Sequence, residues 1–244
     1  DPLSDFFFNN GKLKRPKYIK DSLTSMEFVF VKGGCYQMGE TFGDGANDEK
    51  PVHEVCVDDF YMGKYEVTQR EYKKIMGTNP SYFKRGDRYP VEKVSWNDAS
   101  NFIKKLNGRT GRKYKLPTEA EWEFAARERG KKVRFGTGND IIGSDEANYD
   151  ASRKYKKSYS RSGTYRKATV QVGSFRPNDL GLYDMSGNVW EWCSDWYDKE
   201  YYKSSPRNNP KGPGDGDRRV LRGGSWGNDS WLVRAANRSK DLLI

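Results

Sequence analysis

The sequence predicts an α+β protein in which ordered loops outweigh helices and strands. Three segments carry helix-start signals, two are strand-like, and the residues from Gly130 to Asn178 show almost no periodicity. The second half also spaces glycines among tryptophans and carboxylates, from Gly181 to Trp192 and from Arg219 to Trp226. Glycine lets the backbone turn tightly while aromatic side chains anchor it. We therefore expect a loop-rich core or a cation site there, rather than a simple helix or strand.

The composition bounds the class of protein and its partners. A chain of 244 residues fits one large domain or two small ones. Hydrophobic residues make up only 34% and aromatic residues 14%, so much of the core must be aromatic. The net charge of +10 favours acidic partners such as nucleic acid, anionic lipid or acidic glycans, although a solvated lysine-rich surface gives the same number. No apolar run reaches the roughly 18 residues of a membrane span, so contact with a membrane is expected only through an anchor outside this chain.

The cysteines and the histidine limit the chemistry. Cys35, Cys56 and Cys193 fit no zinc spacing, and buried free thiols are the favoured interpretation. A bridge between Cys35 and Cys56 is the alternative in an oxidising compartment. His53 is the single histidine, so sites with several histidines are excluded and only one imidazole base is available. A structural role is expected for it.

The strand-like segments set the expected domain boundary. Residues 1–25 combine phenylalanines with a basic run, which predicts an N-terminal extension that packs onto the body or leads to an anchor. Residues 26–244 form the expected domain. Its first strand covers Glu27–Lys32 and a second covers Val55–Met62, because β-branched and aromatic residues are enriched in both.

Three helices are expected in the first half. Thr68, with the glutamate three residues later, forms a capping box that begins a short helix ending at Gly77. A second helix follows Ser95, with apolar residues on one face and Gly108 as its stop. A second capping box begins a third helix just after Pro117.

Seven motifs, in order, carry a resemblance to a known family, and they lie between about Phe28 and Arg238. They are Gly33–Gly39, Pro51–His53, Glu66–Thr68, Val94–Trp96, Leu116–Glu123, Gly181–Trp192 and Arg222–Trp226. The chain resembles the sulfatase-modifying domain of the formylglycine-generating-enzyme type. The resemblance implies a C-type-lectin-like fold, loop-rich, with small twisted sheets and two or three helices.

Resemblance to this family does not imply catalysis. Oxidases of this type resemble one another in two cysteines soon after Arg-Gly-Gly-Ser, which bind copper as thiolates. Residues 226–234 contain no cysteine, and Cys193 lies next to the Trp-Glu-Trp motif instead. The related iron-dependent sulfoxide synthases need several histidines. We therefore expect no copper site and no enzyme, with a copper-dependent oxidase of the formylglycine-generating type as the alternative.

Another branch that the chain resembles, the variable proteins of diversity-generating retroelements, uses the segment after Arg-Gly-Gly-Ser-Trp for display. By this resemblance Arg234, Ala236 and Arg238 hold the backbone, and residues before, between and after them bind a ligand. The expected ligand-binding residues are Trp226, Gly227, Asn228, Asp229, Ser230, Trp231, Leu232, Asn237, Ser239 and Lys240, with Asp241 beside them. Aromatic anchors combined with Asn, Asp and Ser are typical of adaptable binding loops. Trp231 as a core residue is the alternative.

The resemblance also implies calcium near the Gly-Asn-x-Trp-Glu-Trp loop. The matching ligands are the side chains of Asp184 and Glu191 and the carbonyls of Gly187 and Val189, all of them hard oxygen donors. The alternative interpretation is that the two carboxylates only accept hydrogen bonds from N–H groups of the loop.

If the segment after Arg-Gly-Gly-Ser-Trp displays a binding surface, the kind of partner and the location of the protein can also be predicted. We expect a protein or glycan ligand on another cell and an exported, cell-surface monomer. The basic segment Lys154–Lys167 interleaves tyrosines with cations, but no nucleic-acid fold signature accompanies it, so nucleic acid is not expected.

Overall fold

The structure, a computed structural model, describes residues 7–9 and 12–243. The three α-helices are α1 Gln69–Met76, α2 Trp96–Thr110 and α3 Glu119–Ala126. Three single-turn 3₁₀ helices are η1 Asn47–Glu49, η2 Arg153–Tyr155 and η3 Tyr201–Lys203. The strands are β1 Phe7–Asn9, β2 Lys12–Lys14, β3 Tyr18–Lys20, β4 Glu27–Val31, β5 Gly34–Met38, β6 His53–Val57, β7 Phe60–Gly63, β8 Glu191–Trp196, β9 Arg218–Arg222 and β10 Ser239–Leu242. The rest of the described chain is turn and loop, which confirms the α+β, loop-rich class.

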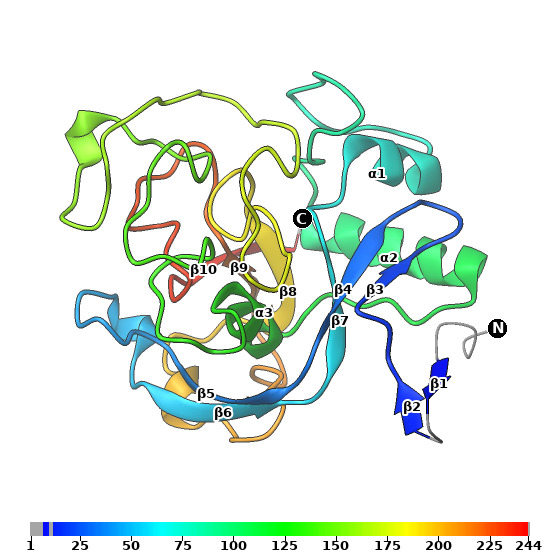
Figure 1. The fold of residues 1–244 in the computed structure, drawn as a ribbon, viewed down its shortest axis with the longest axis horizontal. Helices are drawn as coiled ribbons and strands as arrows, with labels where there is room; N and C mark the ends of the chain where they lie inside the picture. The colour runs from blue at the N-terminus through cyan, green and yellow to red at the C-terminus, as the bar shows by residue number, and fades with distance from the viewer. Residues whose placement is uncertain (1–6, 10–11, 244) are drawn as a thin grey trace.

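The strands form small antiparallel sheets. Two sheets have three strands, in the orders β3-β4-β7 and β10-β9-β8, and two are hairpins, β1-β2 and β5-β6. Figure 1 shows α1 and α2 beside the β3-β4-β7 sheet, the β5-β6 hairpin along the opposite end, and α3 between that hairpin and β8-β9. Small sheets with long ordered loops are the C-type-lectin-like arrangement that the family motifs implied.

Helix α3 lies at the centre of the core. Its Trp122 is fully buried against Val29 of β4, Cys193 of β8 and Val220 of β9. The opposite face of α3 packs Phe124 on the β5-β6 hairpin, where it contacts Tyr36. Every residue of this helix except Glu121 is therefore buried, the charged Glu119 and Glu123 included.

Local sequence signals place the helices as expected, with one difference. The capping boxes at Thr68 and Thr118 are both formed, and Gly77 ends α1 in the left-handed region with φ +83°. The expected stop at Gly108 is wrong, because α2 continues through it and ends at Gly111, where φ is +69°. Gly108 keeps helical geometry, and the left-handed conformation that ends a helix occurs three residues later.

The strand boundaries differ more from the sequence prediction. The expected strand Val55–Met62 is two strands, β6 and β7, which belong to different sheets and turn at Asp58 and Asp59. Trp192 lies within β8, although its motif was expected to be loop. Strand β3 pairs with β4, so the fold includes residues before the expected boundary at 26. Part of the expected N-terminal extension, residues 1–6 and 10–11, lies outside the described residues.

Two of the cysteines form a disulfide. Cys35 and Cys56 face one another across the β5-β6 hairpin and are joined, so the favoured interpretation of three free thiols is wrong for this pair. Cys193 is a buried free thiol. His53 contacts the ring of Tyr202 and the carbonyl oxygen of Pro51, contacts that fit the structural role expected for it. Among residues 7–9 and 12–243, no helix has the length and apolar character needed to cross a bilayer.

Candidate functional site

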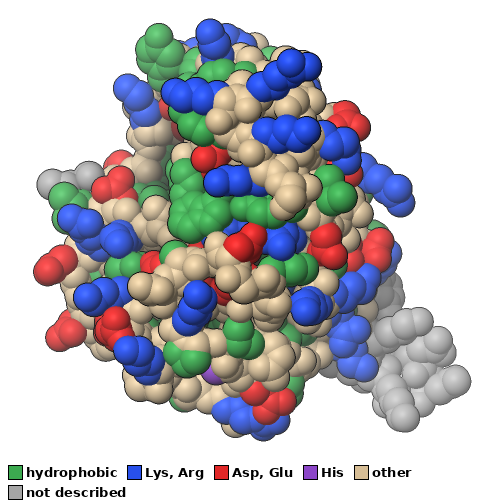
Figure 2. All heavy atoms as spheres, turned by 90° about the vertical axis from the view of Figure 1, so that its left-hand side faces the viewer, with side chains coloured by type: hydrophobic (Ala, Val, Ile, Leu, Met, Phe, Trp, Pro, Cys, Tyr) green, Lys and Arg blue, Asp and Glu red, His purple; other side chains and the backbone are tan. Residues whose placement is uncertain are grey.

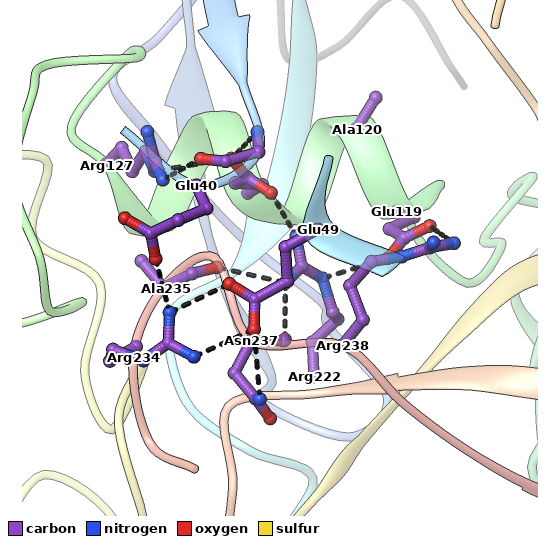
Figure 3. Close-up of polar contacts among 12 residues, drawn as sticks. Glu40, Glu49, Glu119, Ala120, Arg127, Arg222, Arg234, Ala235, Asn237 and Arg238 are labelled. Atoms are coloured by element: carbon purple, nitrogen blue, oxygen red, sulfur yellow. Dashed lines mark hydrogen bonds and ion pairs between the residues drawn. The ribbon is translucent and has the colours of Figure 1, made fainter. Parts of the chain in front are cut away.

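Three buried arginines hold the C-terminal segment onto the body (Figure 3). Arg222 ends β9, and Arg234 and Arg238 follow in the loop that leads to β10. Their side chains are 0%, 1% and 0% exposed. A buried guanidinium must be paired and hydrogen-bonded, because its fixed fork of donors has lost water. Each of the three has such partners on α3 or on the loop between β5 and β6.

Arg222 and Arg238 share the carboxylates of α3. Arg238 binds Glu119 through two parallel contacts, Nε to Oε1 at 2.7 Å and Nη2 to Oε2 at 2.9 Å. Arg222 pairs with Glu123 and donates to the carbonyl oxygens of Ala235, at 3.0 Å, and of Asn237. Burial raises the pKa of Glu119, but the guanidinium groups of Arg238 and Arg222 outweigh it, and the pKa lies below its ordinary value. The network joins α3, β9 and the final loop into one rigid unit.

Arg234 supports the loop from beneath. It binds both oxygens of Glu49 at 2.8 Å and one oxygen of Glu40 at 2.6 Å. Its Nε donates to the carbonyl oxygen of Trp231 at 2.9 Å, and its guanidinium lies 4.8 Å from the centre of the Trp231 indole. The expected scaffold role of Arg234 and Arg238 therefore has a structural basis in buried ion pairs.

The loop from Trp226 to Leu232 is fixed by its own side chains. The carboxylate of Asp229 accepts hydrogen bonds from the backbone N–H groups of Trp231, at 2.8 Å, and Leu232, at 3.3 Å. The Asn228 side-chain oxygen accepts from the N–H of Ser225, three residues earlier, at 2.9 Å. The Asx turn at Asp229 and this backward contact replace secondary structure as the source of rigidity. These acceptors therefore shape the loop itself.

Figure 2 shows the left-hand side of the Figure 1 view. Trp226, Gly227, Asn228, Asp229, Trp231 and Leu232 are each at least partly exposed. The Trp231 indole N–H donates to the carbonyl oxygen of Asp44 at 3.2 Å, which places the ring across the loop between β5 and β6. Trp231 is half-buried, so it is neither a core residue nor a free one. A partly exposed, immobilised tryptophan is well suited to be a binding anchor.

The remaining expected ligand residues lie elsewhere or are buried. Ser230 and Asn237 are 1% and 2% exposed, so neither presents its side chain to a partner, and Asn237 contacts Glu49 of the arginine network. Ser239, Lys240 and Asp241 lie in β10, an edge strand paired with β9, where Lys240 contacts the Tyr197 ring. Of the expected ligand residues, those of the 226–232 loop other than Ser230 lie together and are at least partly exposed, and Lys240 is exposed on β10.

Three carboxylates, that of the buried Glu66 and those of the partly buried Asp184 and Glu191, lie around the other motif. Asp184 accepts from the N–H of Gly173 at 2.8 Å, and Glu191 accepts from the indole N–H of Trp122 at 3.0 Å. Glu66 was not expected among them; it accepts from the N–H of Val189 at 3.0 Å and from the amide of Asn188. Its motif, Glu66–Thr68, was recognised in the sequence as one of the family motifs and as the start of a helix, but Glu66 was not expected at this site.

Burial raises the pKa of all three carboxyl groups. That of Glu191 rises to about 7 and that of Asp184 to about 6, while the pKa of Glu66 is raised by burial and then by the charges of Asp184 and Glu191. Within the part of the chain that the structure describes, no Lys or Arg forms an ion pair with any of the three. Nor do three or more His, Cys, Asp or Glu side chains there gather closely enough to bind a metal by themselves. Any cation would need backbone carbonyls as well, which is how Ca²⁺ is commonly bound.

The backbone between Asp184 and Glu191 turns tightly at Gly187. Gly187 has φ +89°, and a Cβ there would lie 2.3 Å from the carbonyl oxygen of Asn148. Only glycine therefore allows this turn. The N–H of Trp226 donates to the carbonyl oxygen of Asn188 at 2.9 Å, so this turn also supports the start of the 226–232 loop.

The fold and the two motif loops define a C-type-lectin-like protein whose final loop is held on a buried arginine network. The chain belongs to the family of the sulfatase-modifying factor enzyme 1-like domain, whose model matches residues 15–242. This family contains the formylglycine-generating enzymes that the motifs resembled.

Two curated relatives and one solved structure illustrate the family's range. A protein named formylglycine-generating enzyme, from Streptomyces coelicolor, is 31% identical over 81% of this chain and 78% of its own length. A protein named serine/threonine-protein kinase pkn1, from Chlamydia pneumoniae, is 31% identical over 88% of this chain. The chain spans about a third of that relative, 35% of its length. The structure of Treponema denticola variable protein 1 is 26% identical, with a TM-score of 0.74 over 93% of this chain and 94% of that one.

Proposed function

We propose that this protein is a non-catalytic binding protein that presents the 226–232 loop to a protein or glycan ligand. One observation carries the proposal: buried ion pairs and Asx turns fix the loop from beneath, while its tryptophans remain partly exposed. A loop ordered before binding loses little conformational entropy when it meets a ligand. The likeness to Treponema denticola variable protein 1 supports the same function. An exported, cell-surface location would follow from that function.

The oxidase alternative needs two thiolates that converge on copper. Residues 226–244 contain no cysteine. Burial raises the pKa of the Cys193 thiol well above its ordinary value, and Cys35 and Cys56 are joined to each other. A thiol held in its protonated form is a poor metal ligand. These facts favour binding over copper chemistry.

Changing Trp231 to alanine is expected to weaken ligand binding about 30-fold, the effect of losing an anchor worth about 2 kcal/mol. The ligand is first found by screening the labelled protein on an array of glycans and extracellular protein domains. The affinity of each variant for the strongest hit is then measured by biolayer interferometry. The matched control is Tyr18→Ala, another exposed aromatic, on β3 at the other side of the molecule (Figure 1). Equal affinities of the Trp231→Ala variant and the unchanged protein would mean that the partner docks elsewhere.

A turnover assay separates binding from catalysis. The protein is loaded with copper and incubated with a cysteine-containing peptide under oxygen, and peptide oxidation is followed by mass spectrometry. We expect no oxidation above the rate of free copper. Oxidation by the protein that disappears in the Cys193→Ser variant would overturn the display proposal.

We further infer that calcium binds at the turn between Asp184 and Glu191, held by these two carboxylates and by the carbonyls of Gly187 and Val189. Partly buried hard oxygens without a cationic partner among the described residues fit this ion. Glu66 would orient the turn through the N–H of Val189. The bound ion would neutralise the repulsion among the carboxylates and stiffen the support of the 226–232 loop.

Calcium is expected to raise the melting temperature of chelator-treated protein, because an ion that binds only the folded state at 100 times its Kd stabilises by about 2.7 kcal/mol. The increase should be larger near pH 7.5 than near pH 5.5. Without the ion, the folded state takes up protons at carboxyl groups whose pKa is raised, so its stability falls as pH rises through about 5 to 7. Calcium replaces those protons. Glu191→Gln should abolish the shift, whereas the exposed control Asp217→Asn should retain it; equal shifts in both variants would contradict the site.

A further inference from the structure

A basic hollow of about 760 Å³ lies beside the display loop. It is lined by Arg153, Lys156, Arg161, Ser158, Ser162 and Ile141. In Figure 2 the Lys and Arg side chains gather over the upper part of the same face. The chain from 151 to 178 contains Lys and Arg throughout but no Asp or Glu, so this loop carries a strong local positive charge.

The walls of the hollow are anchored. Strand-like contacts join Ile142 and Ser160, and the N–H of Arg161 donates to the carbonyl oxygen of Ile142 at 2.8 Å. The Tyr149 hydroxyl donates to the same carbonyl at 3.2 Å from a buried ring. Arg161 itself is oriented by Asp145, at 2.9 Å, and Glu146, at 2.7 Å. The hollow is therefore built by packing rather than by a solvated loop alone.

The other two cations of the hollow have no acid partner. Within the described ranges, no carboxylate forms an ion pair with Arg153 or Lys156, and both side chains are exposed. Ser158 and Ser162 add exposed hydroxyls, and Ile141 is 50% exposed at the edge. Paired donors for an anion, hydroxyls for hydrogen bonding and one apolar surface are the groups that recognise a charged sugar ring.

The aromatic side chains of this segment do not form a platform for nucleic acid. Tyr159 packs against Phe135 and under the guanidinium of Arg134, and Tyr165 stacks on Trp226. Tyr155 is left exposed, with Lys154 over its ring. Single-stranded nucleic acid is bound by successive bases stacked on aromatic rings, and one ring cannot provide that. A concave site also suits a saccharide better than a flat lipid surface.

We propose that this hollow binds an anionic sugar, one bearing a sulfate ester or a carboxylate, within an acidic glycan. Arg153 and Lys156 contact the anionic group, and Ser158 and Ser162 bond the sugar hydroxyls. The hollow is separate from the display loop but adjoins it, because the N–H of Asp150 donates to the carbonyl oxygen of Asn228 at 2.8 Å. Trp231 does not line the hollow, so a glycan held there would not need it.

The test measures binding of a heparin octasaccharide to the full chain by isothermal titration calorimetry, in about 0.15 M NaCl and at two further salt concentrations. The double variant Arg153→Gln/Lys156→Gln is expected to bind at least tenfold more weakly and with a shallower salt dependence. The matched control Lys104→Gln/Lys105→Gln removes the same charge from exposed positions of α2. Melting temperatures should be unchanged in both, because all four side chains are exposed.

Equal losses in the two double variants would show that only net charge attracts the glycan, and would overturn the proposal. So would tighter binding of an oligothymidylate of equal charge than of the octasaccharide, which would indicate a nucleic-acid site. Trp231→Ala should leave octasaccharide affinity within about twofold. The two proposals can therefore fail independently. If the 226–232 loop binds no ligand, the octasaccharide titration is unaffected; if the hollow binds no glycan, the effect of Trp231→Ala on the other ligand is unaffected.

Discussion

Replacing Arg222 by alanine is expected to lower the free energy of unfolding by about 3–5 kcal/mol, the cost of breaking a buried ion pair by removing one partner. The change leaves the buried Glu123 with Arg127, 3.3 Å away, as its one remaining guanidinium partner among the described residues, and it removes the donors to the carbonyl oxygens of Ala235 and Asn237. Each orphaned acceptor adds its own cost of desolvation. Urea denaturation followed by tryptophan fluorescence measures the loss.

The matched control is Arg218→Ala, at the exposed start of the same strand. Its effect should stay within about 0.5 kcal/mol, as for an ordinary surface position. A loss below about 1.5 kcal/mol for Arg222→Ala would mean that Arg127 or entering water compensates Glu123 for the lost guanidinium. The network would then contribute less to the rigidity of the final loop than its burial indicates.

The parts of the fold that could be predicted from sequence are those coded locally. Capping boxes at Thr68 and Thr118 depend on residues only three positions apart, so they can be recognised from the sequence without knowledge of the tertiary structure. The end of α2 could not be chosen between Gly108 and Gly111, because either glycine can end a helix and packing decides. The split of the expected 55–62 strand into β6 and β7 depends on pairing with β5 and β4, which lie far away in the chain.

The candidate site was predictable in outline and not in detail. Tryptophan, glycine and arginine motifs located the final loop, and the resemblance assigned the scaffold positions. Burial of Asn237 could not be inferred, because it depends on Glu49 approaching from the loop between β5 and β6. Glu66 was missed for the same reason: it is 122 residues from its partner Asn188. Contacts between residues so far apart in the chain produce no local sequence pattern from which they could be predicted.

Arg234 stabilises the interior of the protein and also supports Trp231, so replacing it should have a different effect from replacing Trp231 itself. Its guanidinium neutralises Glu40 and Glu49, which are both buried, and the same group supports the carbonyl and ring of Trp231 from below. Arg234→Ala is therefore expected to cost about 3–5 kcal/mol, since two carboxylates lose their counter-charge. Trp231→Ala removes a half-buried ring and should cost roughly 1 kcal/mol, on the scale of one cation–π contact and one net hydrogen bond.

The two changes should also differ in how they affect binding. In the Trp231→Ala variant the loop keeps its Asx turns, so ligand affinity falls while hydrogen exchange at the N–H groups of residues 231 and 232 stays slow. In the Arg234→Ala variant exchange at those groups should quicken, because the carbonyl of Trp231 loses its donor and the turn opens. Hydrogen exchange with mass spectrometry on both variants measures this. If Arg234→Ala left exchange slow, the Asx turns alone would hold the loop, and the arginine beneath it would stabilise only the interior.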